Sequence, residues 1–386
     1  MRFRFSPAAG TGAMRLMPVI WVAATLGATL APILRHENNF EIFRTASNHF
    51  MAAKDLYVPS ERHFDLFKYT PSFALLFVPF AVLPFTIGLF LWNALNAATL
   101  YWALGRLLPR TQAAVARAIV LGDLIGSLQS AQSNALIAAL IILSFTELER
   151  GHDLRAAVAV VAGGFIKVFP LAGVSFALLH TKRRRFAFSC LAVGTVLFGA
   201  PLVFTGPAWL ARQYSMWLSI QRVDAGDPGF SVMQQLKFWL GVHWPAWPQQ
   251  LVGVALLLAP LVVHRERRAD KDWRLLYVAS LLMFCVLFNH QSESPSFVIA
   301  MTGVSVWFVR SWRSRWSWLV LGFVILGTVL VSSSAMPPAV RDQLTTWRFK
   351  AVPVLVVWII LQVEQWRSTP ARRTALRENS APAPAA

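Results

Sequence analysis

The stretch FNHQSESPSFVIA, residues 288–300, places a short polar run inside a region that is otherwise apolar. Apolar segments flank it at about residues 275–289 and 295–309. Two apolar segments joined by so short a turn predict two membrane helices, and their connection cannot lie far from the membrane surface. We therefore expect His290 and Glu293 at the rim of the membrane, where they can line a cavity.

The composition of the whole chain is that of a membrane protein. Of its 386 residues, 56% are hydrophobic and 14% are charged, and the mean hydropathy is +0.52. Soluble domains carry about 25% charged residues. Since a helix needs roughly 20 apolar residues to cross lipid, we predict an all-α polytopic membrane protein with about 12 transmembrane helices. The other long apolar segments lie at about residues 15–34, 86–107, 185–204, 249–263, 316–333 and 350–364.

The net charge of +18 is concentrated in short basic clusters at the ends of apolar segments. Such clusters mark the cytoplasmic side of a membrane protein, so nucleic acid is not an expected partner. The cytoplasmic clusters are TKRRR (181–185), HRERRADKDWR (264–274), RSWRSR (310–315) and RSTPARRTALR (367–377). This topology predicts a multi-pass protein of the cytoplasmic (inner) membrane. Its outward-facing parts are residues 35–69, Gln129 to Asn134, the region of Lys167, the loop 206–247, FNHQSESP and the loop near 336–349.

Two passages do not fit a simple series of crossings. Residues 70–85 follow the first outer loop and are expected to form a re-entrant or juxtamembrane helix. Residues 154–180 are expected to form two short helices that turn at FIKVFP, each only about 20 Å long. The alternative is one crossing helix, which would move Arg150 and Arg155 to the outside.

The chain is expected to form one membrane domain, residues 1–366, followed by a disordered cytoplasmic tail, residues 367–386. The tail is rich in Ala and Pro and poor in large apolar side chains. A transporter or lipid flippase would be expected to show internal repeats and polar groups near the middle of the membrane. Neither feature is found, which favours an enzyme with its site at the outer surface.

Ionisable residues in apolar surroundings are the first candidates for a functional site. Lys167 lies between GGFI and VFP, where a charge has little structural use. Ser294 and Pro295 could instead be the N-cap and the first residue of a helix. Helix capping does not account for the presence of His290 or Glu293.

The first outer loop contains the densest group of acids and bases. Its apolar residues predict an amphipathic helix that lies along the membrane surface and carries Glu41, Asn48 and Asp55. Asp65 and Lys68 follow before the next apolar stretch. An ordinary solvated loop is the alternative. The apolar positions of this helix are Phe40, Phe43, Ala46, Phe50 and Met51.

From about residue 36 to 310 the chain is similar to a known family. The segments concerned are NNFEIFRTASNHFMAAKDLY, FDLFKYTPSFALLFVPFAVLP with LWNALN after it, SAQSNALIAALIILSF, AGGFIKVFPLAG and FNHQSESPSFVIA. In this order they resemble the membrane-embedded glycosyltransferases of family 87, which have the GT-C fold. The resemblance implies sugar transfer from a polyprenyl-phosphate donor to a lipid-linked or other envelope glycan acceptor, at the outer face of the membrane.

One position departs from the family's pattern. Mannosyltransferases of the family have an aspartate at the start of the first-loop motif, where this chain has Asn39. An asparagine cannot act as a general base. Glu41 is the favoured replacement, Asp55 and Asp65 are alternatives, and a catalytically inactive family member is a further possibility.

The resemblance and the residue types together suggest roles. An inverting transfer needs a carboxylate to accept the proton of the acceptor hydroxyl and cations to stabilise the departing phosphate. Glu41 and Asp65 are the candidate catalytic residues, and Lys68, Lys167 and His290 are the candidates for binding the donor phosphate. No cofactor is expected, and the scattered acids do not demand a divalent metal. The candidates for substrate binding, some of which could equally cap helices, are Asn39, Gln129, Gln132, Asn134 and Glu293.

Overall fold

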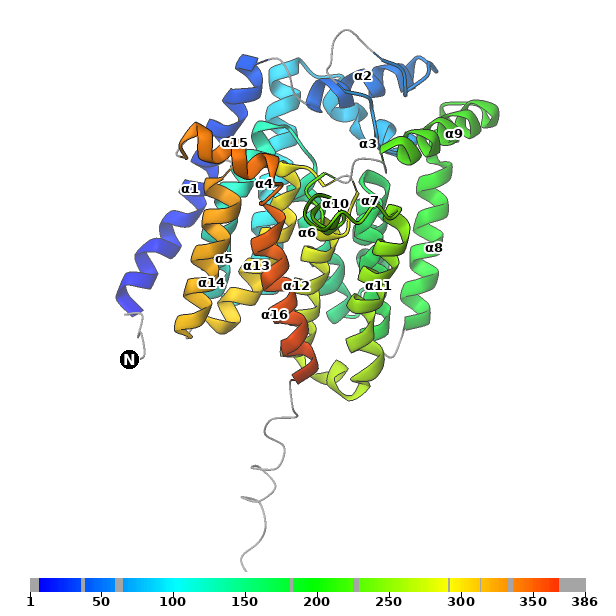
Figure 1. The fold of residues 1–386 in the computed structure, drawn as a ribbon. Helices are drawn as coiled ribbons and strands as arrows, with labels where there is room; N and C mark the ends of the chain where they lie inside the picture. Colours follow the sequence, from blue (N-terminus) through cyan, green and yellow to red (C-terminus); the bar gives the residue numbers. More distant parts are fainter. Residues whose placement is uncertain are drawn as a thin grey trace, which may run out of the picture.

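The structure is a computed structural model, and it is a bundle of helices (Figure 1). It describes residues 7–35, 39–59, 65–180, 183–224, 229–290, 292–312, 314–331 and 336–367, and these contain no β-strand. The predicted all-α architecture is confirmed for this part of the chain. The proposed disordered tail lies almost entirely outside the described residues.

The elements follow one another through short turns. In chain order they are α1 (Pro7–Arg35), α2 (Asn39–Met51), α3 (Pro71–Ala81), α4 (Phe85–Leu107), α5 (Arg110–Gln129), α6 (Asn134–Glu149), α7 (Asp153–Ile166), η1 (Phe169–Leu179), α8 (Arg183–Gly199), η2 (Ala200–Val203), α9 (Pro207–Asp224), α10 (Val232–Leu240), α11 (Ala246–Val263), η3 (Arg265–Ala269), α12 (Lys271–Leu287), η4 (Ser294–Ser296), α13 (Phe297–Ser311), α14 (Arg315–Ile325), η5 (Leu326–Leu330), α15 (Pro338–Thr346) and α16 (Ala351–Arg367).

Five of the described helices are long and apolar enough to cross a membrane. They lie in α1, α4, α5, α8 and α11, and a sixth span is possible if α15 and α16, bent by 57°, are counted as one. The central helices α6, α12 and α13 have 16, 17 and 15 residues and are almost completely buried. The expected total of about 12 spans stays a prediction.

Residues 154–180 fold back on themselves. Helix α7 ends at Ile166, the chain turns at Lys167, and η1 packs against α7. Glu149, at the end of α6, lies 3.1 Å from His180 and 2.7 Å from Arg274 at the start of α12. The start of α7 and the end of η1 therefore lie at the same end of the bundle. This arrangement is the predicted pair of short helices and not a single crossing helix.

Helix α2 has the predicted amphipathic pattern, but its apolar face packs against the protein. The Phe43 ring makes edge contacts with four rings, those of Tyr69, Phe73, Phe77 and Trp92. One detail of the expectation was wrong, because Asp55 lies beyond the end of the helix. Met51 is 50% exposed and so does not pack against the protein as the other apolar residues do. Helix α3 has 11 residues, a length of about 16 Å, so it is too short to cross the membrane core.

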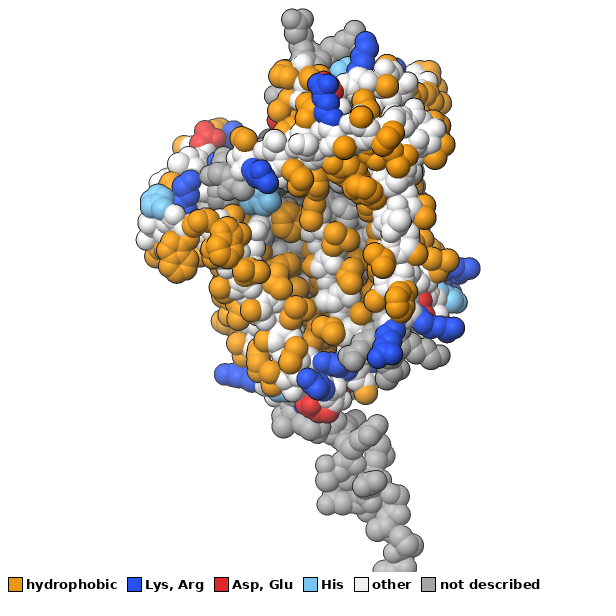
Figure 2. All heavy atoms as spheres, turned by 90° about the vertical axis from the view of Figure 1, so that its right-hand side faces the viewer, with side chains coloured by type: hydrophobic (Ala, Val, Ile, Leu, Met, Phe, Trp, Pro, Cys, Tyr) orange, Lys and Arg blue, Asp and Glu red, His pale blue; other side chains and the backbone are white. Residues whose placement is uncertain are grey.

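The two ends of the bundle differ in charge. The start of α8, the α11–α12 and α13–α14 turns and the end of α16 lie together at the lower end in Figure 1, and Figure 2 shows Lys and Arg side chains gathered there. Helices α2, α3, α9 and α15 lie at the upper end. The described parts of the basic clusters that were expected in the cytoplasm are therefore on one side. The segment 206–247, which was expected to be a long loop, is mostly helical.

Replacing Phe43 by Ala tests the role of the aromatic cluster. Phe43 is completely buried, so we expect Phe43→Ala to lower the free energy of unfolding by about 3–5 kcal/mol. Met51→Ala on the same helix is the control and should change it by less than about 0.5 kcal/mol. Thermal unfolding of the purified protein in detergent measures both. Equal losses would show that α2 is not held by this cluster.

Candidate functional site

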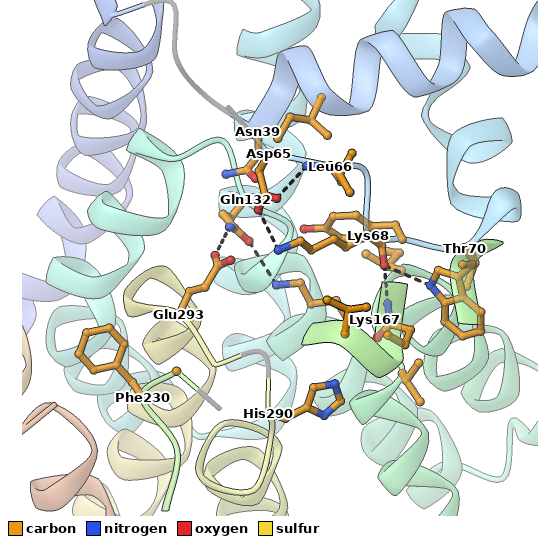
Figure 3. A pocket seen from close by; sticks show the side chains of 18 of the residues that line it. Asn39, Asp65, Leu66, Lys68, Thr70, Gln132, Lys167, Phe230, His290 and Glu293 are labelled. Carbon is orange, nitrogen blue, oxygen red and sulfur yellow. Dashed lines mark hydrogen bonds and ion pairs between the residues drawn. The ribbon is translucent and has the colours of Figure 1, made fainter. Parts of the chain in front are cut away.

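A cavity of about 400 Å³ is shown in Figure 3. Its lining includes Asn39 at the start of α2, a helix at the upper end of the bundle in Figure 1. The turns that follow α5, α7 and α12 meet there, together with the start of α2 and the segment before α3. Seven of the predicted site residues line it: Asn39, Asp65, Lys68, Gln132, Lys167, His290 and Glu293. Residues far apart in the sequence are therefore gathered in one place.

The centre of the site is a chain of hydrogen bonds through Gln132. The ammonium group of Lys167 donates to Asn134 Oδ1 at 2.8 Å and to Gln132 Oε1 at 3.2 Å. The amide nitrogen of Gln132 donates to a carboxylate oxygen of Glu293 at 2.6 Å. Asn134 is fully buried and does not line the cavity. It therefore acts behind the lining, by holding the lysine.

A second cation comes from the segment before α3. Lys68 forms an ion pair of 2.9 Å with Asp65, whose other oxygen accepts the backbone N–H of Leu66 at 2.7 Å. The backbone carbonyl of Lys68 accepts hydrogen bonds from Trp217 at 3.1 Å and Gln221 at 2.9 Å, both on α9. Trp217 and Gln221 thus fix this segment. Figure 3 shows the side chains of Lys68 and Lys167 directed toward the same space.

Burial sets the electrostatic character of the site. It lowers the pKa of Lys167, and Lys68 adds to this effect, whereas Glu293 opposes it. Burial also raises the pKa of Tyr69, whose ring faces the Lys167 ammonium at 5.8 Å. A cation whose charge is only partly compensated by its surroundings favours a bound anion.

The lower wall is built by two loops that are bonded to each other. The Phe230 N–H donates to the Ser292 carbonyl at 2.7 Å. Gly229 has a φ of +55°, and a Cβ there would lie 2.2 Å from the Ser292 oxygen, so only glycine fits. His290 lies beside them, with its Nδ1 3.1 Å from the Gln250 amide of α11.

Three candidates lie away from this cavity. Glu41 is half-buried on α2 and does not line the cavity, although Asn39 and Ile42 do. Gln129 is exposed at the end of α5. Asp55 is held by Arg212 and by the Gln213 amide, at 2.9 Å from the latter.

Some lining residues were missed by sequence reasoning. Arg348, Tyr69 and Gln221 all lie in segments that were expected to face outward, so topology was the available signal for each. Within the described residues, no three His, Cys, Asp or Glu side chains are grouped as metal ligands would be.

The sequence model of glycosyltransferase family 87 matches residues 67–288, more than half of the chain. The chain belongs to glycosyltransferase family 87. This confirms the resemblance and makes the protein a membrane glycosyltransferase, which takes a sugar donor and an acceptor. The matched residues include Lys68, Gln132 and Lys167, and the match ends just before His290 and Glu293. No curated protein matches the chain.

The lowered pKa of Lys167 predicts a pH dependence of stability. Between this pKa and the ordinary value of 10.5, the unfolded chain holds a proton that the folded protein has lost. The stability contributed by this side chain therefore increases as the pH rises through that interval. We expect the melting temperature of the wild type, relative to Lys167→Met, to rise over the same interval. A difference that is constant with pH, measured by thermal unfolding, would contradict this.

Proposed function

We propose that this glycosyltransferase transfers a sugar from a polyprenyl-phosphate donor to a lipid-linked or envelope glycan acceptor at the outer face of the cytoplasmic membrane. The observation that carries the proposal is the cavity itself. It holds the carboxylates of Asp65 and Glu293 beside the ammonium groups of Lys68 and Lys167. A phosphate leaving group and an acceptor hydroxyl need these two kinds of side chain.

The distribution of charge supports the proposed orientation. The basic clusters lie at the end of the bundle opposite the cavity, and clusters of this kind remain in the cytoplasm. The cavity then opens to the outer face. Polyprenyl-phosphate sugars are the donors expected there.

We propose Asp65 as the catalytic base in place of Glu41, because Asp65 lines the cavity and Glu41 does not. The acceptor oxygen attacks the anomeric carbon, and its proton passes to the Asp65 carboxylate. The bond between the anomeric carbon and the phosphate oxygen breaks, and the phosphate leaves with the electron pair. A donor phosphate bound by Lys68 would compete with Asp65 for this lysine and so free the carboxylate to accept the proton.

A lipid-linked donor also needs a path from the membrane to the cavity. Val168 lines the cavity, is 44% exposed, and precedes η1. Both α8 and α11 contact η1, and only 11% of the most apolar part of residues 184–203, which lie in α8 and η2, is buried. Figure 2 shows apolar side chains of this face around a shallow recess. This recess supports an isoprenoid chain lying along η1 with its phosphate at Lys167.

The first test is sugar transfer in nanodiscs from a panel of labelled polyprenyl-phosphate sugars. Loss of a general base lowers turnover by about 100- to 10,000-fold, and we expect this for Asp65→Asn. Glu41→Gln is the matched control and should keep near wild-type turnover. The reverse pattern would return the role of base to Glu41.

The same assay tests the alternative of an inactive protein. If the wild type turns over no donor and Asn39→Asp gains activity, the protein is a degenerate family member. Asn39 already lines the cavity, where its amide donates to the Ser130 carbonyl at 2.8 Å. An aspartate would therefore stand in the same place.

The lipid path gives a separate prediction. Val168→Asn places a polar group where the isoprenoid chain would enter, so the KM for a long-chain donor should rise several-fold more than the KM for a short-chain, water-soluble analogue. Val196→Asn is the control, because Val196 is 67% exposed on α8 and does not line the cavity. Equal effects on both donors would rule out this path.

A further inference from the structure

Arg348 is a further cation that lines the cavity. It lies on the wall that Phe230 and Ser294 form, and its guanidinium carbon lies 5.1 Å from the centre of the Phe230 ring. Within the described part of the chain, it forms no ion pair and its guanidinium makes no hydrogen bond. The other two cations at the cavity differ, since Lys68 pairs with Asp65 and Lys167 is held by Gln132 and Asn134.

The backbone of Arg348 is in an unusual conformation. Its φ is +54°, in the left-handed region that glycine adopts freely and that arginine rarely adopts. The turn between α15 and α16 would therefore form more easily with glycine at this position. Residues with strained backbones are often found at functional sites. An arginine in place of glycine here indicates that its side chain has a function that offsets the strain.

The strained turn is held in place from several sides. The Gln235 amide donates to the Arg348 carbonyl, and the Trp239 indole donates to the Trp347 carbonyl at 3.1 Å. Two residues further on, the fully buried Lys350 anchors the turn to α5 through an ion pair of 3.2 Å with Asp123.

The same lysine connects the turn to the cavity wall. The Lys350 ammonium lies 3.0 Å from the hydroxyl of Ser294, and Ser294 lines the cavity beside Glu293. The position of Arg348 is therefore set relative to the carboxylate of the site. This anchoring prepares the guanidinium for a ligand before the ligand arrives.

We propose that Arg348 is a second anion-binding position of the cavity and takes a phosphate group of a lipid-linked substrate. A guanidinium presents two parallel N–H groups to a phosphate, and a cation–π contact with an aromatic ring helps to hold it in place. The phosphate could belong to the donor or to an acceptor that itself carries a phosphate. That the ligand is a substrate rests on the proposed function, whereas binding of the anion does not.

Binding to the purified full-length protein in phosphatidylcholine nanodiscs tests the proposal. Arg348→Gly should weaken the binding of decaprenyl phosphate or of short-chain phosphatidylglycerol by about 10-fold or more, the loss expected for a charge-assisted hydrogen bond. Its melting temperature should be unchanged or higher, because glycine relieves the strained φ. Arg348→Lys should restore part of the affinity. Arg341→Gly, on α15 and away from the cavity, is the control for loss of a positive charge.

The two probes separate the sources of the phosphate. A loss confined to decaprenyl phosphate assigns Arg348 to the donor, and a loss confined to phosphatidylglycerol assigns it to a phosphate-bearing acceptor. Unchanged affinity for both would overturn the proposal, as would a loss accompanied by a fall in melting temperature that Arg348→Lys does not rescue.

Binding of the anion at Arg348 can also be tested independently of the proposed sugar transfer. If the wild type turns over no sugar donor but its binding of these probes still depends on Arg348, the anion site stands and the proposed reaction does not. Lys350→Met gives the contrasting pattern of a structural residue, with melting temperature and affinity falling together.

Discussion

The site depends on how the charge of Lys167 is accommodated at the tip of an apolar hairpin. A buried ammonium group must find protein oxygen atoms in place of water, and Gln132 and Asn134 supply them from the turn between α5 and α6. The side-chain amide of Gln132 in turn donates a hydrogen bond to Glu293, on the turn between α12 and α13. One lysine thereby brings three separate turns of the bundle to the same level, and the cavity forms between them.

The remaining walls are attached to this centre by hydrogen bonds. Helix α9 holds the carbonyl of Lys68, the Gly229–Phe230 segment is bonded to Ser292, and Lys350 reaches Ser294 from the start of α16. Loops that carry substrate-binding groups are mobile unless a rigid scaffold positions them. Here each loop is fixed to another part of the chain, so the charged groups can be held ready for an anionic ligand.

The accuracy of the sequence predictions followed the range of the interactions involved. The hairpin at residues 154–180 could be predicted because the distribution of charge along the chain places both of its ends on the cytoplasmic side, which can be read from the sequence. Glu41 was misplaced because a helix turns by about 100° at each residue, so neighbouring side chains face different ways. Asn39 and Ile42 face the cavity and Glu41 does not. Arg348 has no local signal, because only the bend before α16 brings it to the cavity.

The sequence by itself determined that this chain is an all-helical membrane glycosyltransferase with its basic clusters at one end, since apolar length, charge distribution and family motifs are properties of the chain. It also supplied most of the polar residues of the cavity. Only the tertiary structure decided which carboxylate and which cations share that cavity. The direction of a side chain depends on helix register and on contacts between segments far apart in the sequence, as in the pairing of Lys350 with Asp123. Such contacts exist only once the bundle has formed.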